Sequence, residues 1–98
     1  MAKGYLIVEI DTVDPELMVR YREKTPDAIA AFGGRFIVRG GASQTLEGDW
    51  KPPRIVVIEF PSVAKAREFY GSDLYKPLLE MRLRAGRSKA VLVEGVAE

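Results

Sequence analysis

Four short runs, in which apolar side chains alternate with other residues, constrain the fold of this chain most strongly. Each run is rich in Val, Ile, Leu or Phe and is bounded by Gly, Pro, Asp or Ser. Alternation with a period of two residues is typical of β-strands. We therefore expect strands over residues 5–10, 35–39, 54–60 and 89–94.

The segment between the first two predicted strands has the signals of a helix. Asp14 is suited to cap its beginning, Pro15 fits the first helical position, and Gly33 is expected to end it. Pro26 lies inside this segment and lacks a backbone N–H. We therefore expect a kink or a brief interruption of the helix at Pro26.

A second helical segment lies between the last two predicted strands. Ser62 is expected to open it, and the Gly-Ser-Asp sequence at 71–73 should break it. A further helix is then expected from about residue 74 to 85. Pro77 is compatible with that helix only if it lies in the first turn.

The predicted elements follow the order βαββαβ over residues 1–98, which we treat as a single domain. Two right-handed βαβ units with this order form a four-stranded antiparallel sheet with the spatial order 4-1-3-2. Both helical segments then cover the same face of the sheet. The predicted fold class is α+β, with the ferredoxin-like arrangement.

The two faces of the predicted sheet differ in composition. One face is wholly apolar and should lie against the helices; it comprises Leu6, Val8, Ile10, Phe36, Val38, Val56, Ile58 and Phe60. The other face still has Ile7, Ile37, Ile55 and Val57 at its centre, where solvent would favour polar residues. A second copy of the chain is the simplest cover for this face, because a twofold axis brings the patch against itself. We therefore expect a homodimer formed through the sheet.

The same second face carries charged residues with an expected arrangement. We expect the first and third strands to be parallel neighbours, so that Glu9 and Glu59 lie near the same end of the sheet. If the registers hold, Arg35 then lies close to Glu59 and Lys89 close to Glu9. One interpretation is that Glu59 is a general base or acid whose pKa is raised in a water-poor cavity. The other is a structural ion network beneath the dimer interface.

The chain has no Cys, no His and no Asn. This absence excludes thiol nucleophiles, disulfides, His-based triads, the usual zinc sites and His-ligated haem. We expect no metal and no cofactor. The 15 basic and 14 acidic residues leave a net charge of +1, which does not favour nucleic acid as a partner.

No stretch approaches the roughly 20 apolar residues that a membrane helix needs, and the first apolar run is too short and too charged for a signal peptide. We therefore expect no membrane partner and a cytoplasmic location.

Several residues outside the strand pattern are candidates for ligand binding. Trp50 lies in the long connection over residues 40–54, where it could cover the mouth of a pocket or pack on a partner subunit. Tyr21 and Tyr75 could donate hydrogen bonds to a ligand, or serve packing with a satisfied hydroxyl. Arg82 could turn inward from its helix to hold a carboxylate.

Four segments of the chain resemble the domain of unknown function 1330 family, a branch of the dimeric α+β-barrel superfamily. They are YREKTPDAIAAFGGRFIVRGG, LEGDW, RIVVIEFPS and SDLYKPLLEMR. The matching motif positions are Tyr21, Pro26, Gly33, Gly34, Arg35, Arg39, Gly40, Gly41, Glu47, Gly48, Trp50, Arg54, Glu59, Phe60, Tyr75 and Arg82. The resemblance implies a ferredoxin-like subunit that pairs sheet to sheet into a dimeric barrel. It implies no particular reaction, since proteins of this superfamily range from cofactor-free monooxygenases to sensing domains.

Three functional hypotheses follow. In the first, a homodimer binds a small anionic or enolisable organic molecule through Tyr21, Arg35, Arg39, Tyr75 and Arg82, with Trp50 as a lid.

In the second, a cofactor-independent isomerase or monooxygenase-like enzyme uses Glu59 as its catalytic base, and Arg39 or Arg35 stabilises an enolate. In the third, the chain is a dimerisation or scaffold domain without a ligand.

Overall fold

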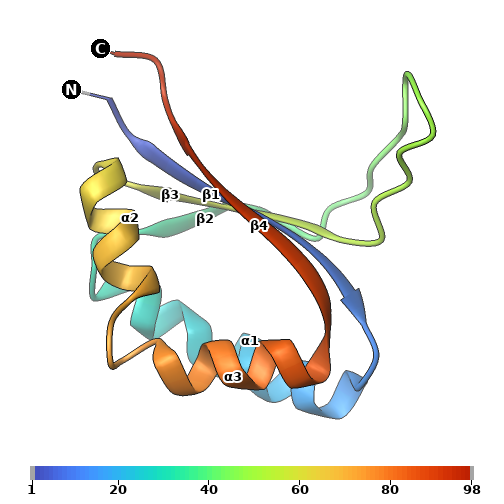
Figure 1. The fold of residues 1–98 in the computed structure, drawn as a ribbon, viewed down its shortest axis with the longest axis horizontal. Helices are drawn as coiled ribbons and strands as arrows, with labels where there is room; N and C mark the ends of the chain where they lie inside the picture. Colours follow the sequence, from blue (N-terminus) through green and yellow to red (C-terminus); the bar gives the residue numbers. More distant parts are fainter. Residues whose placement is uncertain (1, 98) are drawn as a thin grey trace.

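The computed structural model describes residues 2–97, which form a four-stranded antiparallel sheet with three helices on one side (Figure 1). The strand order is β2-β3-β1-β4, which is the predicted ferredoxin-like order. The strands are β1 (Gly4–Thr12), β2 (Arg35–Arg39), β3 (Ile55–Phe60) and β4 (Gly86–Glu94). The helices are α1 (Pro15–Ala30), α2 (Val63–Tyr70) and α3 (Lys76–Ala85). None of the helices in this part of the chain is long and apolar enough to cross a membrane.

Helix α1 begins where the sequence predicts and continues past its internal proline. The Asp14 carboxylate accepts a hydrogen bond of 3.2 Å from the backbone N–H of Leu17, which satisfies one of the free donors of the first turn. The interruption predicted at Pro26 is wrong, because α1 is helical from residue 15 to residue 30.

Helices α2 and α3 also follow their sequence signals. The Ser62 hydroxyl accepts a hydrogen bond of 3.1 Å from the backbone of Lys65, and Pro77 lies in the first turn of α3, as expected. Strand β4 begins directly after α3, earlier than the predicted start at residue 89. Gly86 permits this junction, because a Cβ atom there would lie 2.4 Å from the carbonyl oxygen of Asp11.

The hydrophobic core lies between the sheet and the helices. The predicted inner residues of β1 and β3 are buried, as are several side chains that the helices direct at them. Burial of apolar surface is the main favourable term in folding, so this layer holds the sheet and the helices together. The largest fully buried side chains are Tyr75, Phe60, Phe69, Met18 and Ile29.

The direction of β3 differs from the prediction. Strands β1 and β3 are antiparallel, with Tyr5 opposite Glu59 and Glu9 opposite Ile55. Glu9 and Glu59 therefore lie at opposite ends of the outer face, the side of the sheet that faces away from the helices. The physical reason is the topology: the helical crossover makes β2 parallel to β1, and the next connection reverses the chain again.

A β-bulge in β2 changes which face two of its residues occupy. Phe36 pairs with Ile58, but the register then shifts, so that Val38 lies opposite Val57 and Arg39 opposite Val56. The inserted residue moves Val38 to the outer face and Arg39 to the inner face, because it interrupts the alternation of side chains. The prediction that Val38 faces the helices is therefore wrong.

Candidate functional site

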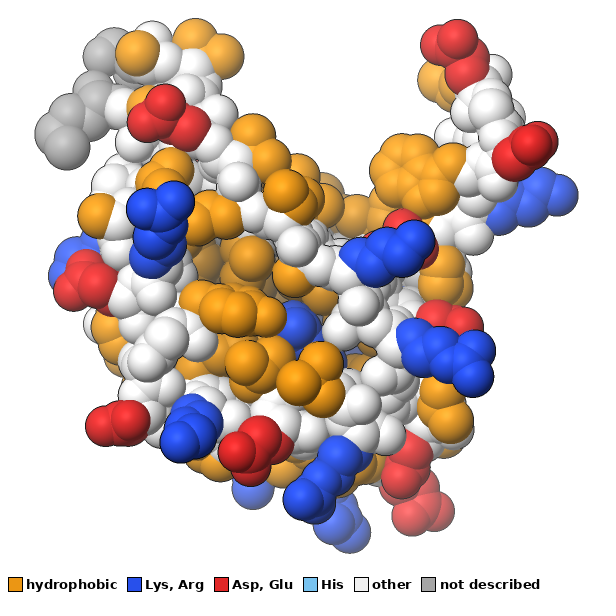
Figure 2. All heavy atoms as spheres, viewed as in Figure 1, with side chains coloured by type: hydrophobic (Ala, Val, Ile, Leu, Met, Phe, Trp, Pro, Cys, Tyr) orange, Lys and Arg blue, Asp and Glu red, His pale blue; other side chains and the backbone are white. Residues whose placement is uncertain are grey.

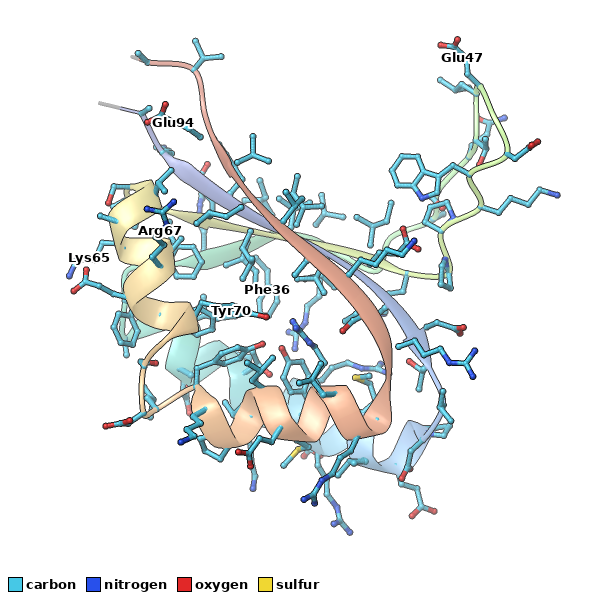
Figure 3. The ribbon with its side chains drawn as sticks, viewed as in Figure 1. Phe36, Glu47, Lys65, Arg67, Tyr70 and Glu94 are labelled. Atoms are coloured by element: carbon cyan, nitrogen blue, oxygen red, sulfur yellow. The ribbon has the colours of Figure 1, made fainter. Side chains whose placement is uncertain are left out.

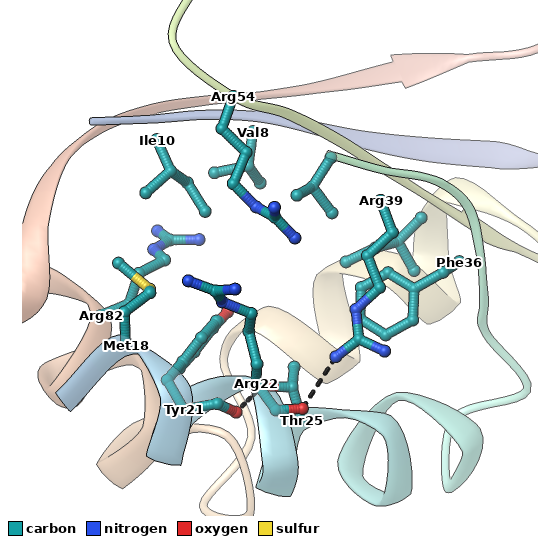
Figure 4. Close-up of a pocket in the computed structure, with 12 residues that line it drawn as sticks. Val8, Ile10, Met18, Tyr21, Arg22, Thr25, Phe36, Arg39, Arg54 and Arg82 are labelled. Atoms are coloured by element: carbon teal, nitrogen blue, oxygen red, sulfur yellow. Dashed lines mark hydrogen bonds between the residues drawn. The ribbon is translucent and has the colours of Figure 1, made fainter. Parts of the chain in front are cut away.

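A narrow cleft with about 20 Å³ of open space lies between the inner face of the sheet and helices α1 and α3 (Figure 4). Apolar side chains of β1 and β3 form one wall, and polar side chains reach in from the other sides. Among the described residues that line it, none is Asp or Glu. Four are arginines, so we call this space the arginine cleft: Arg22, Arg39, Arg54 and Arg82.

The bulge in β2 brings Arg39 to this cleft. Its guanidinium lies 4.2 Å from the centre of the Phe36 ring, a favourable cation–π contact. Its Nη2 also donates a hydrogen bond of 2.8 Å to the carbonyl oxygen of Arg22 (Figure 4). That carbonyl is four residues before Pro26, which has no N–H to donate, so Arg39 supplies the missing donor to the helix.

Arg54 approaches the cleft from the residue before β3. Its guanidinium lies against the backbone of Gly40, where a Cβ atom would be only 2.0 Å from Nη1. Gly40 also has a positive φ of 71°, a backbone conformation that favours glycine, whereas the nearby Arg54 guanidinium is the end of a flexible side chain that could move. Burial lowers the pKa of Arg54, and the positive charges of Arg22 and Arg39 lower it further. Arg22 and Arg39 therefore both repel the Arg54 guanidinium in this part of the cleft.

Arg82 lies deeper, and only 2% of its surface is exposed. Its Nη1 donates to the hydroxyl of Tyr75 and its Nη2 to the hydroxyl of Tyr70, each at 3.3 Å. Figure 3 shows Tyr70 extending from α2 on the helix side of the sheet. No acidic side chain within residues 2–97 forms an ion pair with Arg82.

The tyrosines around Arg82 form a connected group. The hydroxyls of Tyr21 and Tyr75 are 2.6 Å apart and buried. Burial raises the pKa of Tyr75, and the neighbouring Tyr21 raises it further, so this hydroxyl is protonated. Burial lowers the pKa of Arg82, but Tyr75, Tyr21 and Tyr70 outweigh it and leave the pKa above its usual value. Arg82 is therefore a buried cation held by neutral hydroxyls.

Three of the predicted ligand-binding residues thus line the same cleft, and a fourth contacts two of them without lining it. Tyr21, Arg39 and Arg82 line the cleft, whereas Tyr75 supports Tyr21 and Arg82. Two further residues of the cleft, Arg22 and Arg54, were not among the predicted site residues. The alternation of side chains in β3 could have revealed Arg54. It lies two residues before Val56 and four before Ile58, so its side chain points to the same inner face of the sheet.

Glu59 and Arg35 lie on the outer face and not in the arginine cleft. The Glu59 carboxylate accepts hydrogen bonds from Arg35 Nε at 3.0 Å and from the Tyr5 hydroxyl at 3.1 Å, and Lys3 Nζ lies 3.7 Å away. The hydrogen bond from Arg35 is the main reason that the pKa of Glu59 lies below its ordinary value. This ion network matches the predicted proximity of Arg35 and Glu59. A lowered pKa is unfavourable for a general base near neutral pH.

Trp50 also lies on the outer side of the sheet. Its indole N–H donates a hydrogen bond of 3.0 Å to the Glu9 carboxylate, and its side chain borders a shallow groove with Ile7, Ile55 and Val91. Trp50 therefore lies on the opposite side of the sheet from the arginine cleft and does not line that cleft. The loop that carries it projects away from the sheet (Figure 1), with Glu47 at the tip (Figure 3).

The outer face presents apolar side chains to solvent. Ile37 is 44% exposed and Val91 54% exposed, and Val38 and Val93 are exposed beside them. Figure 2 shows hydrophobic atoms gathered in the hollow between the projecting loop and the chain termini. The predicted apolar outer face is therefore present, and the bulge adds Val38 to it.

Within residues 2–97 there is no group of three or more acidic side chains placed to hold a metal ion. The basic and aromatic residues of the arginine cleft suit an anionic partner instead.

Solved structures with low sequence identity share this fold. A protein of unknown function from Rhodopseudomonas palustris is 17% identical, with a TM-score of 0.74 over 99% of this chain and 85% of that chain. A dimeric ferredoxin-like protein of unknown function from Jannaschia sp. CCS1 is 15% identical, with a TM-score of 0.68 over 93% of this chain and 97% of that one.

A putative antibiotic biosynthesis monooxygenase from Nitrosomonas europaea is also similar, at 15% identity and a TM-score of 0.54 over 98% of this chain and 93% of that chain. At such identities the likeness extends to the fold alone. No curated protein sequence matches the chain. The model of the family described as "Domain of unknown function (DUF1330)" matches residues 3–96, and with nearly the whole chain covered, the protein belongs to the DUF1330 family.

Proposed function

We propose that this protein binds a small organic anion in the arginine cleft. The observation that carries the proposal is Arg82, a guanidinium that is almost wholly buried without an acidic partner among residues 2–97. Removing a charge from water is costly unless an opposite charge compensates it. An anionic group of a ligand would supply that compensation and accept hydrogen bonds from the guanidinium.

The rest of the cleft supports the same proposal. The apolar wall, which includes Val8 and Ile58, could contact a hydrocarbon body, while Tyr21 and the arginines could contact polar ends. This division favours an organic anion such as a carboxylate, phenolate or enolate over an inorganic ion.

We also propose that the protein acts as a homodimer joined through the outer face. The exposed apolar residues there, among them Ile37 and Val91, would be covered by the same patch of a second copy. The similarity to dimeric ferredoxin-like proteins supports this arrangement. Arg35 and Glu59 would then belong to the interface, where their ion pair satisfies charges near the apolar contact.

The second candidate function is a cofactor-independent enzyme. The residues of the arginine cleft support this candidate, whereas Glu59 does not. Some proteins of similar fold carry the name antibiotic biosynthesis monooxygenase, and guanidinium groups can stabilise a developing enolate. Glu59 lies on the other side of the sheet, which disfavours it as the base for a ligand in the cleft. The third candidate is a ligand-free scaffold domain, and the titration described below tests it as well.

The test compares anions with neutral molecules of matched shape. Benzoate and hexanoate are titrated into the purified protein beside benzamide and hexanamide, with calorimetry and the melting temperature as readouts. An anion at about a hundred times its Kd should stabilise the fold by about 2.7 kcal/mol, whereas the amides should have little effect.

Two variants assign the binding to the cleft. Arg82→Gln should abolish the response to anions, and Arg84→Gln, on the exposed side of α3, should preserve it. If the amides and the acids act alike, selective anion binding is refuted. If neither acts, anion binding is refuted and the ligand-free scaffold candidate is favoured. Native mass spectrometry of the same samples would report the dimer and any ligand that is purified with it.

A further inference from the structure

We infer that the arginine cleft takes the planar carboxylate head of an organic acid between Arg22 and Arg82, while the body of the acid stays on the solvent side of the cleft. This inference rests on the proposed function, because it specifies which anionic group enters the same site and which side chains hold it. It adds Arg22 to the residues that recognise the ligand.

Two buried donors of the cleft have no partner. Nε of Arg22 and Nε of Arg82 are buried, and neither has a hydrogen-bond partner within residues 2–97. Both side chains line the cleft, and Figure 4 shows their guanidinium groups beside each other. Buried polar groups in folded proteins almost always have partners. One acceptor group between the two guanidinium groups would satisfy both Nε atoms.

The tyrosines around Arg82 engage only part of its guanidinium. Nη1 donates to the hydroxyl of Tyr75 and Nη2 to the hydroxyl of Tyr70, each at 3.3 Å, whereas Nε donates to no atom within residues 2–97. Hydroxyl groups accept these bonds without bringing the opposite charge that a buried cation favours. A carboxylate at Nε would bring that charge.

Arg22 reaches the cleft from α1, where it is half-buried. Its carbonyl oxygen accepts the 2.8 Å hydrogen bond from Arg39, which fixes the turn of α1 that carries the Arg22 side chain. No acidic side chain within residues 2–97 forms an ion pair with Arg22. Two neighbouring guanidinium groups that both lack an acidic partner favour an anion between them.

The open space of the cleft limits the size of that anion. It amounts to about 20 Å³, whereas one water molecule needs about 10–15 Å³. The two oxygen atoms of a carboxylate suit such a space better than the three oxygen atoms of a sulfonate or phosphate. A water molecule also fits, but it is uncharged and has hydrogen atoms to donate, whereas the arginines that line the space are cations and donors.

The body of the acid lies outside this enclosed space. Phe36 and Arg39 line the cleft from β2, where Arg39 is exposed to solvent. Figure 4 shows these two side chains on the opposite side of the cleft from Arg82. We therefore expect the body to leave the head on the side of Phe36 and Arg39, and to be slim next to the carboxylate, because little room surrounds the head.

The experiment compares singly charged anions with the same number of carbon atoms in the body, by calorimetry in dilute buffer where screening is weak. Pentanoate is the slim carboxylate, pivalate carries its carbon atoms as a branch next to the carboxylate, and butane-1-sulfonate has a head with three oxygen atoms. Pentanoate should bind about tenfold or more tightly than either of the others. Formate, a head without a body, should bind about tenfold or more weakly than pentanoate.

Variants and spectra test the role of Arg22. Arg22→Met should weaken the binding of pentanoate about tenfold or more, whereas Arg20→Met, at an exposed residue of the same helix, should not change it. In ¹⁵N–¹H spectra of the wild type, pentanoate should shift the Nε–H signals of both Arg22 and Arg82 and leave that of the exposed Arg84 in place. If Arg22→Met fails to fold, the spectra and the comparison of anions still decide the outcome.

Other results would overturn the inference in distinguishable ways. If pivalate or butane-1-sulfonate binds as tightly as pentanoate, the slim planar head is refuted and anion binding stays intact. Full affinity in Arg22→Met, or a shift of the Arg82 signal alone, would refute the role of Arg22. Formate that binds as tightly as pentanoate would assign the site to a free small anion and refute the organic acid. A failure of every anion to bind would refute the proposed function together with the inference.

Discussion

The guanidinium of Arg39 donates its hydrogen bond to the carbonyl of Arg22, the group that Pro26 leaves without a helical donor. A strand residue thereby completes the hydrogen bonding of a helix and is held at the mouth of the cleft. Pro26 and Arg39, both motif positions of the family, are thus linked structurally: Pro26 leaves the Arg22 carbonyl without a helical donor, and Arg39 supplies one.

This relationship predicts an energetic coupling between Arg39 and Pro26. Arg39→Met should destabilise the protein by about 1 kcal/mol, because it removes a charge-assisted hydrogen bond at an exposed site and a cation–π contact. In a Pro26→Ala background the alanine N–H can serve the Arg22 carbonyl, so the same change should cost less. Urea unfolding of the four proteins in this double-mutant cycle measures the coupling. Equal costs in both backgrounds would contradict the assigned role.

A second prediction concerns the buried hydroxyl of Tyr75. Tyr75→Phe removes the acceptor of Arg82 and the partner of Tyr21, both buried, and should cost about 1–3 kcal/mol. Tyr70→Phe should cost less, because Tyr70 is 36% exposed and water can replace it. The two variants are compared by their urea midpoints, provided that the dependence of the unfolding free energy on urea is unchanged. A larger loss of stability in Tyr70→Phe than in Tyr75→Phe would contradict the prediction.

A third prediction concerns Gly40 and its neighbour. Gly40→Ala should displace the Arg54 guanidinium and strain the backbone, so both stability and anion affinity should fall, the former by about 1–2 kcal/mol. Gly41→Ala is the matched control, because a Cβ atom there meets nothing within 4 Å. Melting temperatures and benzoate titration of both variants test this. Loss of affinity in both variants alike would show that the loop, and not Arg54, is responsible.

The fourth prediction is a pH dependence due to Glu59. Its pKa in the folded protein is below the ordinary value of 4.5, chiefly because of Arg35. The folded state therefore binds fewer protons there than the unfolded state, so this group stabilises the fold above about pH 4.5. That contribution is lost as the pH falls through the folded pKa.

The measurement is urea unfolding of the wild type and Glu59→Gln from pH 6 down to pH 3. The difference in stability between them should shrink towards the acid end. Glu47→Gln, in the exposed loop, is the control variant, since no ion pair or hydrogen bond within residues 2–97 holds that carboxylate. A constant difference for Glu59→Gln would exclude the lowered pKa.

The fifth prediction tests the homodimer. Val91→Glu places a charge on the exposed apolar face, in the middle of its edge strand β4, and should convert the dimer to a monomer in sedimentation velocity experiments. Val13→Glu, at a residue that is exposed outside the strands, is the control and should leave the assembly unchanged. A wild-type monomer, or a Val91→Glu dimer, would refute dimerisation through this face.

The order of the elements was predictable from the sequence because the signals that determine it are local. Alternating apolar residues identified the strands, and Asp14 and Ser62 identified two helix starts. The right-handed crossover rule then left few topologies for this order of elements. The apolar outer face was predictable for the same reason, since residues such as Ile7 and Val57 alternate with the core residues of their strands.

The composition of the cleft could be predicted only in part. Tyr21, Arg39 and Arg82 were selected as ligand-binding residues, but the reasons for their convergence are not local. The alternation of apolar and polar residues does not reveal the bulge between Phe36 and Val38, because the apolar side chains of Ile37 and Val38 are compatible with either face of the sheet. Its effect is nevertheless decisive, since it sends Arg39 to the inner face.

By itself, then, the sequence determined the ferredoxin-like architecture, because hydrophobic periodicity and capping depend on residues that are close along the chain. Only the tertiary structure decided the site. Strand direction placed Glu9 and Glu59 at opposite ends of the outer face. The bulge and the packing of α3 gathered Arg39 and Arg82 around one cleft. These outcomes depend on register and on long-range packing, in which a shift of one residue reverses the face that a side chain occupies.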